Sequence, residues 1–390
     1  MSEQVKESQS KRSPAIWHPV VDFLCVGGAS IIAGIGMIWW FSVHPEWVLE
    51  FDRYSGVGSV RKLDDVYLFW VLTLLINYPH FMASYRILYR SRAQVQTYRW
   101  SAIWIPLFLA VLCCSAVFMS ESPTATGDAA KAELTRIGLG SWSYTSIVFG
   151  VMAGFNVVYL GWHYNMQSWG MTASFARIHG LSFTDNERWA IKSGFFAMVL
   201  AHAVLYLIWS PIIRNKWVSD LLLSMTSLLA VMGGVALIYG AMGFRDAYKR
   251  TGKRIPINAI TPWVAAFFWY FLVARYHNLF GIAVAIQIAH ALQYLSFTTR
   301  VERNLLAPQS NQSAAGKTML TMAGLTLCGW LVFVVPMELA DSGGFGLRYL
   351  LAVKFLVIAI NTHHFFVDGA IWKISNPEVR RTLFAHLAAH

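Results

Sequence analysis

Apolar stretches of about twenty residues recur along the whole chain, and this repetition limits the possible folds more than any other feature. A helix of that length crosses the hydrocarbon core of a bilayer. Helices also satisfy their own backbone polar groups, which lipid cannot do. We therefore predict an all-α, polytopic membrane bundle of about ten spans. The predicted ranges are 23–43, 65–87, 102–120, 142–163, 189–210, 221–244, 261–276, 278–298, 318–338 and 347–371.

The domain organisation follows from these ranges. The region 261–298 fits either two spans joined by a turn at 276–278 or one span followed by a re-entrant segment. Outside the spans there is little sequence for a second folded unit. We expect a polar tail over 1–14, a single membrane domain over 15–372 and a surface helix over 373–390. Asn376 and Pro377 suit the N-cap and the first position of that last helix.

The composition agrees with a membrane protein. Hydrophobic residues make up 56% of the chain and charged residues 13%, whereas a soluble domain has about 25% charged residues. The start of the chain lacks the apolar region of a cleaved signal peptide. All four cysteines fall in predicted spans without a CxxC pair, so we expect neither a zinc–thiolate site nor a disulfide framework.

The net charge of +11 is explained by topology. With ten spans and both termini in the cytoplasm, Lys and Arg are about three times as frequent in the inner segments as in the outer loops. This bias supports an even number of spans and cytoplasmic termini. Nucleic-acid binding would need a soluble basic face with interleaved aromatic residues, which the sequence lacks. We predict a multi-pass protein of a bacterial cytoplasmic membrane, with the lipid bilayer as its partner.

Histidines provide the most informative polar pattern. His363 and His364 are adjacent within the last predicted span. Ionisable side chains are costly in a membrane and mark functional sites. In the ten-span arrangement, His80, His163 and His290 fall at a similar depth, near the inner ends of three other spans. Buried polar groups without a shared purpose should scatter in depth, so these residues predict one common site.

Helical spacing adds partners to these histidines. Asp368 is four residues after His364, and residues three or four apart are neighbours on a helix. Metal-bound imidazoles usually donate their second N–H to a polar neighbour, which fixes the ring. We predict metal ligation and catalysis by Asp368, and a catalytic role for Tyr294. The other predicted metal ligands are His80, His163, His290, His363 and His364. The predicted orienting residues are His18, Asp22, Asn77, Gln167, Gln293 and Asn361.

Two neighbouring features have structural interpretations. Pro79, directly before His80, is expected to kink or locally unwind its span. His202 lies deeper and on an odd-numbered span, so we expect it to form an interhelical hydrogen bond.

Nitrogen and oxygen donors without a thiolate suit iron, copper, manganese or zinc. The predicted set exceeds the needs of one catalytic zinc, which favours one or two irons. The hypothesis we favour is a non-haem iron oxygenase, hydroxylase or desaturase. It would act on a lipid or other apolar substrate at an inward-facing site and draw electrons from a cytosolic donor.

Two alternatives remain open at this point. The first is a membrane redox protein in which two of the histidines are axial ligands of haem. The second is a proton-coupled transporter that uses the histidines as a relay.

Overall fold

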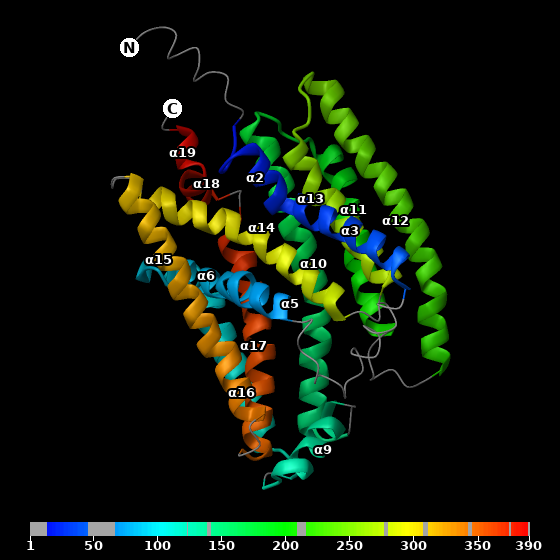
Figure 1. Ribbon diagram of the computed structural model, residues 1–390, viewed down its shortest axis with the longest axis vertical. Coiled ribbons are helices and arrows are strands. Elements are labelled where there is room, and N and C mark those ends of the chain that lie inside the picture. The colour runs from blue at the N-terminus through cyan, green and yellow to red at the C-terminus, as the bar shows by residue number, and fades with distance from the viewer. Residues whose placement is uncertain are drawn as a thin grey trace.

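The structure, a computed structural model, describes residues 14–45, 67–122, 124–138, 142–208, 216–276, 280–306, 311–341, 345–373 and 376–388. Within these ranges every regular element is a helix. Helices α10, α11, α12 and α17 run roughly along the long axis of the molecule, and α14 crosses them obliquely (Figure 1). The predicted all-α class is confirmed.

The elements up to α9 include three π-helical turns, which carry the label η. They are α2 (Pro19–Phe23), η1 (Leu24–Gly28), α3 (Ala29–Val43), α5 (Tyr67–Leu72), η3 (Thr73–Asn77), α6 (Tyr78–Leu88), α7 (Arg92–Thr97), η4 (Trp100–Trp104), α8 (Ile105–Phe118) and α9 (Gly127–Gly138).

The rest of the described chain contains the longest helices, three short ones and one further π-helical turn. They are α10 (Tyr144–Ile178), α11 (Asp185–Ile208), α12 (Lys216–Thr251), α13 (Ile257–Arg275), α14 (Phe280–Leu306), α15 (Asn311–Gly329), η5 (Trp330–Val334), α16 (Val335–Asp341), α17 (Leu347–Ile371), α18 (Pro377–Leu383) and α19 (Ala385–Ala388).

Eight helical segments in the described part of the chain are long and apolar enough to cross a membrane, as expected of a multi-pass protein. They are Pro19–Val43, Trp100–Phe118, Tyr144–Ile178, Asp185–Ile208, Lys216–Thr251, Ile257–Arg275, Ser313–Ala340 and Leu347–Ile371. The described parts of the other two predicted spans, 67–87 of 65–87 and 280–298 of 278–298, are also helical but are not among the eight. These two carry His80 and His290 together with other polar residues, which lowers their apolar character. The count of about ten therefore stays a prediction.

The region 261–298 consists of two helices. Helix α13 ends at Arg275, and α14 begins at Phe280. The helical break coincides with the turn expected at 276–278, most of which lies outside the described residues.

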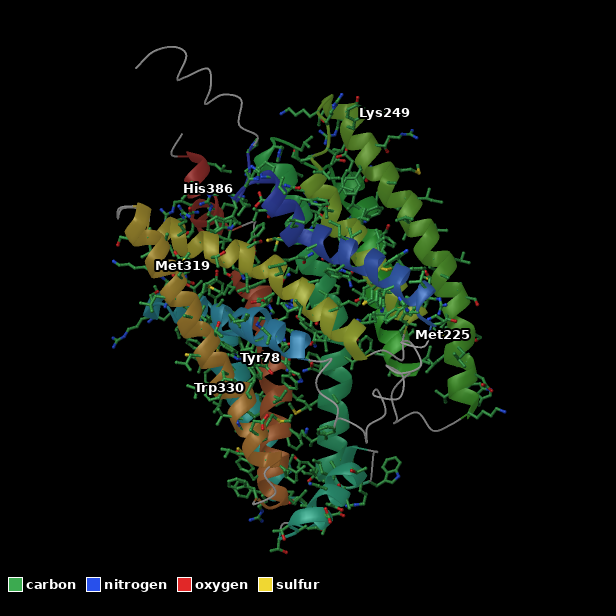
Figure 2. The ribbon with its side chains drawn as sticks, in the orientation of Figure 1. Tyr78, Met225, Lys249, Met319, Trp330 and His386 are labelled. Atoms are coloured by element: carbon green, nitrogen blue, oxygen red, sulfur yellow. The ribbon has the colours of Figure 1, made fainter. Side chains whose placement is uncertain are left out.

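The two described ends of the chain lie together. His386 Nε2 in α19 is 3.0 Å from the Ala15 carbonyl oxygen, and Leu383 packs in one apolar cluster with Ile16. Helix α9 lies at the opposite end of the molecule (Figure 1). Lys249 and His386 lie toward the shared end, whereas Met225 lies toward the other (Figure 2). Both ends of the chain are thus on one side, and the assignment of that side to the cytoplasm stays a prediction.

Two π-helical turns, η3 and η1, lie next to the helices that carry the buried histidines. The π-helical turn η3 directly precedes Tyr78-Pro79 at the start of α6, where a proline cannot donate a backbone hydrogen bond. In η1, Gly27 has φ 144°, and a Cβ there would lie 2.6 Å from Ala265 Cβ. Only glycine fits this position. The adjacent Val26 carbonyl accepts a 2.8 Å hydrogen bond from Gln293 Nε2 in α14.

The surface of the bundle carries exposed apolar residues, whereas polar residues gather inside it. Leu221, Val231, Val235 and Ile238 of α12 are exposed apolar residues, which suits a face in contact with lipid. Buried histidines and their polar neighbours instead gather where α6, α10, α14 and α17 pack against one another.

Candidate metal centre

Three histidines and one aspartate direct their donor atoms toward a common point. His80 lies in the first turn of α6 and His163 in α10. His364 and Asp368 lie one turn apart in α17. One ligand atom from each residue lies within 4.8 Å of the others, and all four residues are buried. The Nε2 atoms of His364, His163 and His80 are 3.4, 3.7 and 3.9 Å from Asp368 Oδ2.

These donors and their spacing fit a metal ion. Metal bonds to histidine and carboxylate are about 2.0–2.2 Å long, so two ligands of one tetrahedral ion lie about 3.4 Å apart. His80 Nε2, His364 Nε2 and Asp368 Oδ2 are buried without a hydrogen-bond partner among the described residues. Such orphaned atoms are costly unless something satisfies them. One cation would satisfy all three, so this group, which we call the His₃Asp cluster, can hold a metal.

Two hydroxyl groups hold the carboxylate of Asp368 in place. Ser84 Oγ donates to Asp368 Oδ1 over 2.7 Å, and the Tyr294 hydroxyl donates to the same oxygen over 3.0 Å. The two hydroxyl oxygens are themselves 2.6 Å apart. Because both donors bind Oδ1, Oδ2 is left facing the three imidazoles. Ser84 lies one turn after His80, so α6 supplies both a ligand and a group that orients another ligand.

His290 of α14 adjoins the cluster. Its Nε2 lies 3.0 Å from His163 Nε2, and its ring centroid is 5.1 Å from that of His80. The Nδ1 atom of His290 is buried without a hydrogen-bond partner in the described part of the chain. His290 is therefore placed either to orient His163 or to provide a further donor beside it.

Gln167 and Gln293 support α14 rather than an imidazole ring. Gln167 Nε2 donates to the His290 carbonyl oxygen over 2.9 Å and lies 3.2 Å from Gln293 Oε1. Through its other bond to Val26, Gln293 ties η1 to α14. Both predicted orienting residues are thus brought to the edge of the site, where they hold the backbone that carries His290.

His363 does not join the other histidines, which corrects the expectation that all five imidazoles converge. Its Nε2 lies 2.6 Å from the Ser101 carbonyl oxygen in η4, and its ring stacks on Tyr85 at 5.3 Å. Consecutive residues on an α-helix point about 100° apart. With His364 directed into the cluster, His363 must face the neighbouring helices instead.

Four other predicted orienting residues do not belong to the His₃Asp cluster. His18 is exposed, and its Nδ1 accepts a hydrogen bond from Val20 at the start of α2. Asp22 is buried and accepts backbone N–H groups of Ile16 and Trp17 over 2.8 and 3.0 Å. Asn361 donates to the Val357 carbonyl oxygen of its own helix, and Asn77 ends η3 half-buried. The contacts of His18, Asp22 and Asn361 do not reach the cluster, whereas the backbone of Asn77 interacts with the His80 ring one turn later.

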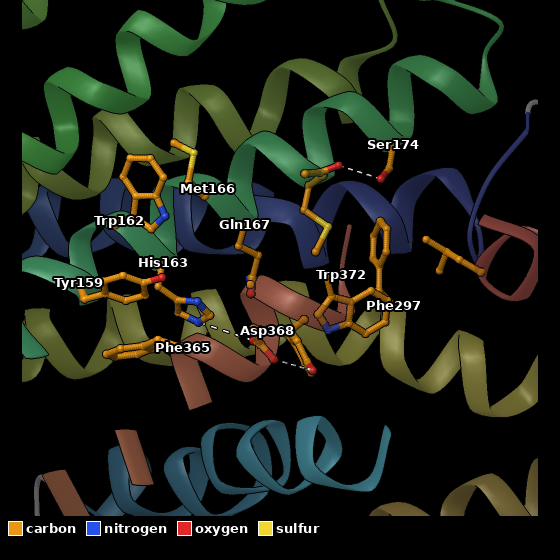
Figure 3. A pocket seen from close by; sticks show the side chains of 15 residues that line it. Tyr159, Trp162, His163, Met166, Gln167, Ser174, Phe297, Phe365, Asp368 and Trp372 are labelled. Atoms are coloured by element: carbon orange, nitrogen blue, oxygen red, sulfur yellow. Dashed lines mark hydrogen bonds and ion pairs between the residues drawn. The ribbon is translucent and has the colours of Figure 1, made fainter. Parts of the chain in front are cut away.

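A cavity of about 260 Å³ opens directly on the cluster. His163, Tyr294 and Asp368 form its polar wall. Its remaining surface is mainly aromatic and thioether: Tyr159, Trp162, Phe297, Phe365 and Trp372, with Met166 and Met171. Figure 3 shows Tyr159 and Phe365 on one side of His163 and Trp372 and Phe297 beyond Asp368. The arrangement can hold an apolar group next to the donor atoms.

The sequence interpretation missed most of this cavity wall. Tyr159, Trp162 and Met166 are separated by three or four residues from one another and lie beside His163 on α10. That spacing places them on one face of a helix. The spacing around His163 on α10 could have identified this face, whereas Trp372 lies just after the end of α17 and has no such signal.

Comparisons with protein-family models, curated proteins and solved structures found no match.

Proposed function

We propose that this protein is an integral-membrane, non-haem metalloenzyme, most simply an iron oxygenase, hydroxylase or desaturase of a lipid or another apolar molecule. One observation carries the proposal: the donor atoms of the His₃Asp cluster, three of them without a hydrogen-bond partner among the described residues, converge next to an aromatic cavity inside a membrane bundle. The membrane would be a bacterial cytoplasmic membrane, with a cytosolic protein as the electron donor.

The donor set argues for the class of metal. Three imidazoles and one carboxylate, without a thiolate, suit iron and related first-row metals. Bound there, iron would supply the one-electron chemistry that activates dioxygen. The four converging donors serve one ion. A second ion would have to recruit His290, which has a free Nδ1 beside the cluster.

The protein's own groups would position the substrate and handle protons. Aromatic walls exclude water and hold an apolar segment against His163 and Asp368. Tyr294 lines the cavity and donates to Asp368 Oδ1, so its hydroxyl can pass a proton to a group in the cavity. Ser84 Oγ, at 2.6 Å from the Tyr294 oxygen, can turn its hydrogen toward it and stabilise the phenolate that remains.

The packing favours a protein-held ion over haem. The ring centroids of His80 and His364 are 4.4 Å apart, and Asp368 Oδ2 lies within 3.9 Å of three Nε2 atoms. Axial haem ligands instead stand on opposite faces of a wide, flat macrocycle. With their centroids only 4.4 Å apart, the rings of His80 and His364 are too close to hold a haem between them.

Metal analysis and an optical spectrum of the purified full-length protein test the proposal. We expect at least one stoichiometric transition metal, no Soret band, and dioxygen uptake that depends on a reductant and an apolar substrate. A strong Soret band would replace the proposal with a haem protein. Protein that retains no metal after iron supplementation would favour a proton relay in a transporter.

A further inference from the structure

A second buried polar group lies beside the His₃Asp cluster and takes no part in it. His202 of α11 and Tyr270 of α13 pair across the helices, with His202 Nδ1 3.0 Å from the Tyr270 hydroxyl. Asn165 of α10 completes the group, because its Nδ2 lies 3.2 Å from the same hydroxyl. All three residues are buried. We call Tyr270 and His202 the tyrosine–histidine pair, and Asn165 is the amide that binds it.

The hydrogen bonds fix the direction of the Tyr270 proton. Asn165 Nδ2 also donates to the Gly161 carbonyl oxygen over 2.8 Å, and a carbonyl oxygen can only accept. The amide NH₂ of Asn165 therefore faces Tyr270, and the phenol oxygen accepts from it. The hydroxyl hydrogen of Tyr270 is left for His202 Nδ1, which accepts it in the tautomer that carries its own hydrogen on Nε2.

Helix α10 connects this pair to the cluster with three consecutive residues. His163 belongs to the cluster, and Asn165 binds Tyr270. Between them, the Tyr164 ring centroid lies 4.2 Å from that of His290 and 6.4 Å from that of His202. His290 in turn contacts His163. A continuous series of ring contacts thus runs from the cluster to the pair.

Gly161 permits this close approach. A Cβ at this position would lie 2.8 Å from His202 Cβ, so any side chain would push His202 away from α10. The pair is therefore built into the packing of α10, α11 and α13.

We propose that Tyr270 and His202 form a redox relay that donates one electron to the centre, an inference that rests on the proposed function. The Tyr270 phenol loses one electron, and its hydroxyl proton moves to His202 Nδ1. The products are a neutral tyrosyl radical and a protonated imidazole. The electron reaches dioxygen, the oxidant being reduced at the centre, through the rings of Tyr164 and His290. An electron from the external reductant restores the phenol as the proton returns.

The histidine is what makes this step feasible in a buried site. Without a proton acceptor, oxidation would leave a cationic phenol in an apolar interior, which is strongly disfavoured. Tyr85 provides the contrast, because it also lies near the cluster but its hydroxyl donates to the Ile360 carbonyl oxygen over 3.2 Å. A carbonyl cannot keep the proton, so Tyr85 should not act as a relay.

Electron paramagnetic resonance of tyrosyl radicals tests the relay in two arms. In the first, metal-free protein is oxidised by light with tris(bipyridine)ruthenium and persulfate and then frozen. We expect a tyrosyl signal that is lost in Tyr270→Phe, reduced in His202→Phe and retained in Tyr85→Phe. In the second, iron-loaded and reduced protein is mixed with dioxygen and freeze-quenched, and the same signal should appear.

The outcomes separate the two proposals. A signal unchanged by Tyr270→Phe in the first arm would overturn the relay, even if the protein binds iron and consumes dioxygen. A Tyr270 signal in the first arm only, in protein that does reduce dioxygen, would also overturn it. Failure to bind metal or use dioxygen would remove the proposed function, whereas the first arm would still report on Tyr270 and His202. Circular dichroism of each variant checks that the helices remain folded.

Discussion

Two buried polar groups that contain histidine flank Tyr164, whose ring centroid is 6.2 Å from that of His163 and 6.4 Å from that of His202, and they differ in how their polar atoms are satisfied. In the His₃Asp cluster, His80 Nε2 and His364 Nε2 face a carboxylate oxygen without a hydrogen-bond partner in the described chain. In the neighbouring group, His202 Nδ1 has a phenol partner at 3.0 Å. Histidine in this bundle is thus placed either to bind an added ion or to exchange a proton with a neighbouring phenol.

The difference shows how to distinguish a ligand from a structural histidine in a membrane protein. Burial does not separate them, because His202 and His80 are both 2% exposed. What separates them is convergence: donor atoms from several helices meet in the His₃Asp cluster, whereas His202 Nε2, also without a hydrogen-bond partner among the described residues, belongs to no such group. The following predictions test this distinction, from the largest expected effect to the smallest.

Removing a cluster imidazole should have the largest effect. His364→Ala leaves only three of the four donors, so metal affinity should fall by more than about 100-fold, beyond the loss typical of outer groups. His363→Ala is the matched control, since His363 is the adjacent residue but faces Ser101. Metal content by mass spectrometry measures both. Equal loss in the two variants would contradict the assignment of these two faces of α17.

Removing the hydroxyl groups behind Asp368 should have a smaller effect. Ser84→Ala or Tyr294→Phe frees Asp368 to rotate, and metal affinity should fall about 10–100-fold. Titration with a competing chelator provides the measurement. The control is Ser296→Ala, because this buried hydroxyl donates only to the Gln293 carbonyl oxygen of its own helix. Unchanged affinity in both test variants would show that Asp368 is not held through Oδ1.

A side chain added at Gly161 should displace His202 and lower the stability of the folded protein. Gly161→Ala places Cβ 2.8 Å from His202 Cβ, and such overpacking costs about 1–3 kcal/mol. Gly154→Ala on the same helix meets no atom within 4 Å, and alanine there should gain about 0.5–1 kcal/mol. Thermal unfolding in detergent should therefore shift in opposite directions. A shift in the same direction would indicate that the helices are not packed this closely.

The smallest effect on the metal should come from Tyr270. Tyr270→Phe removes the partner of His202 but touches none of the cluster donors, so metal content should not change. Metal analysis of this variant tests whether the two groups are independent. Loss of metal in Tyr270→Phe would mean that they form a single site.

Sequence reasoning located the residues of the site but not their directions. The apolar runs predicted helices, and the similar depth of His80, His163, His290 and His364 predicted that they would meet, as they do. His202 was expected to form an interhelical hydrogen bond, and its contact with Tyr270 confirms this. Depth is readable from sequence because a helix advances by a fixed rise per residue.

Rotation of each helix about its axis is what the sequence left undetermined. His363 and His364 have nearly the same depth, and only the packing of α17 against α6 and α10 decides which of them enters the cluster. Likewise, Ser84 reaches Asp368 across 284 positions of the chain. His18 and Asp22 share the general depth, but the N-terminal segment folds back so that Asp22 caps residues 16 and 17.

The order of the ligands along the chain has a consequence for biosynthesis. His80 and His163 are translated early, whereas His364 and the carboxylate of Asp368 belong to the last long helix. Before α17 is made, the cluster has only two neutral imidazoles and lacks its anionic donor, so it should bind a cation weakly. Any metal capture would therefore wait until α17 has joined the bundle. An ion bound there would link α6 and α10 to the last long helix.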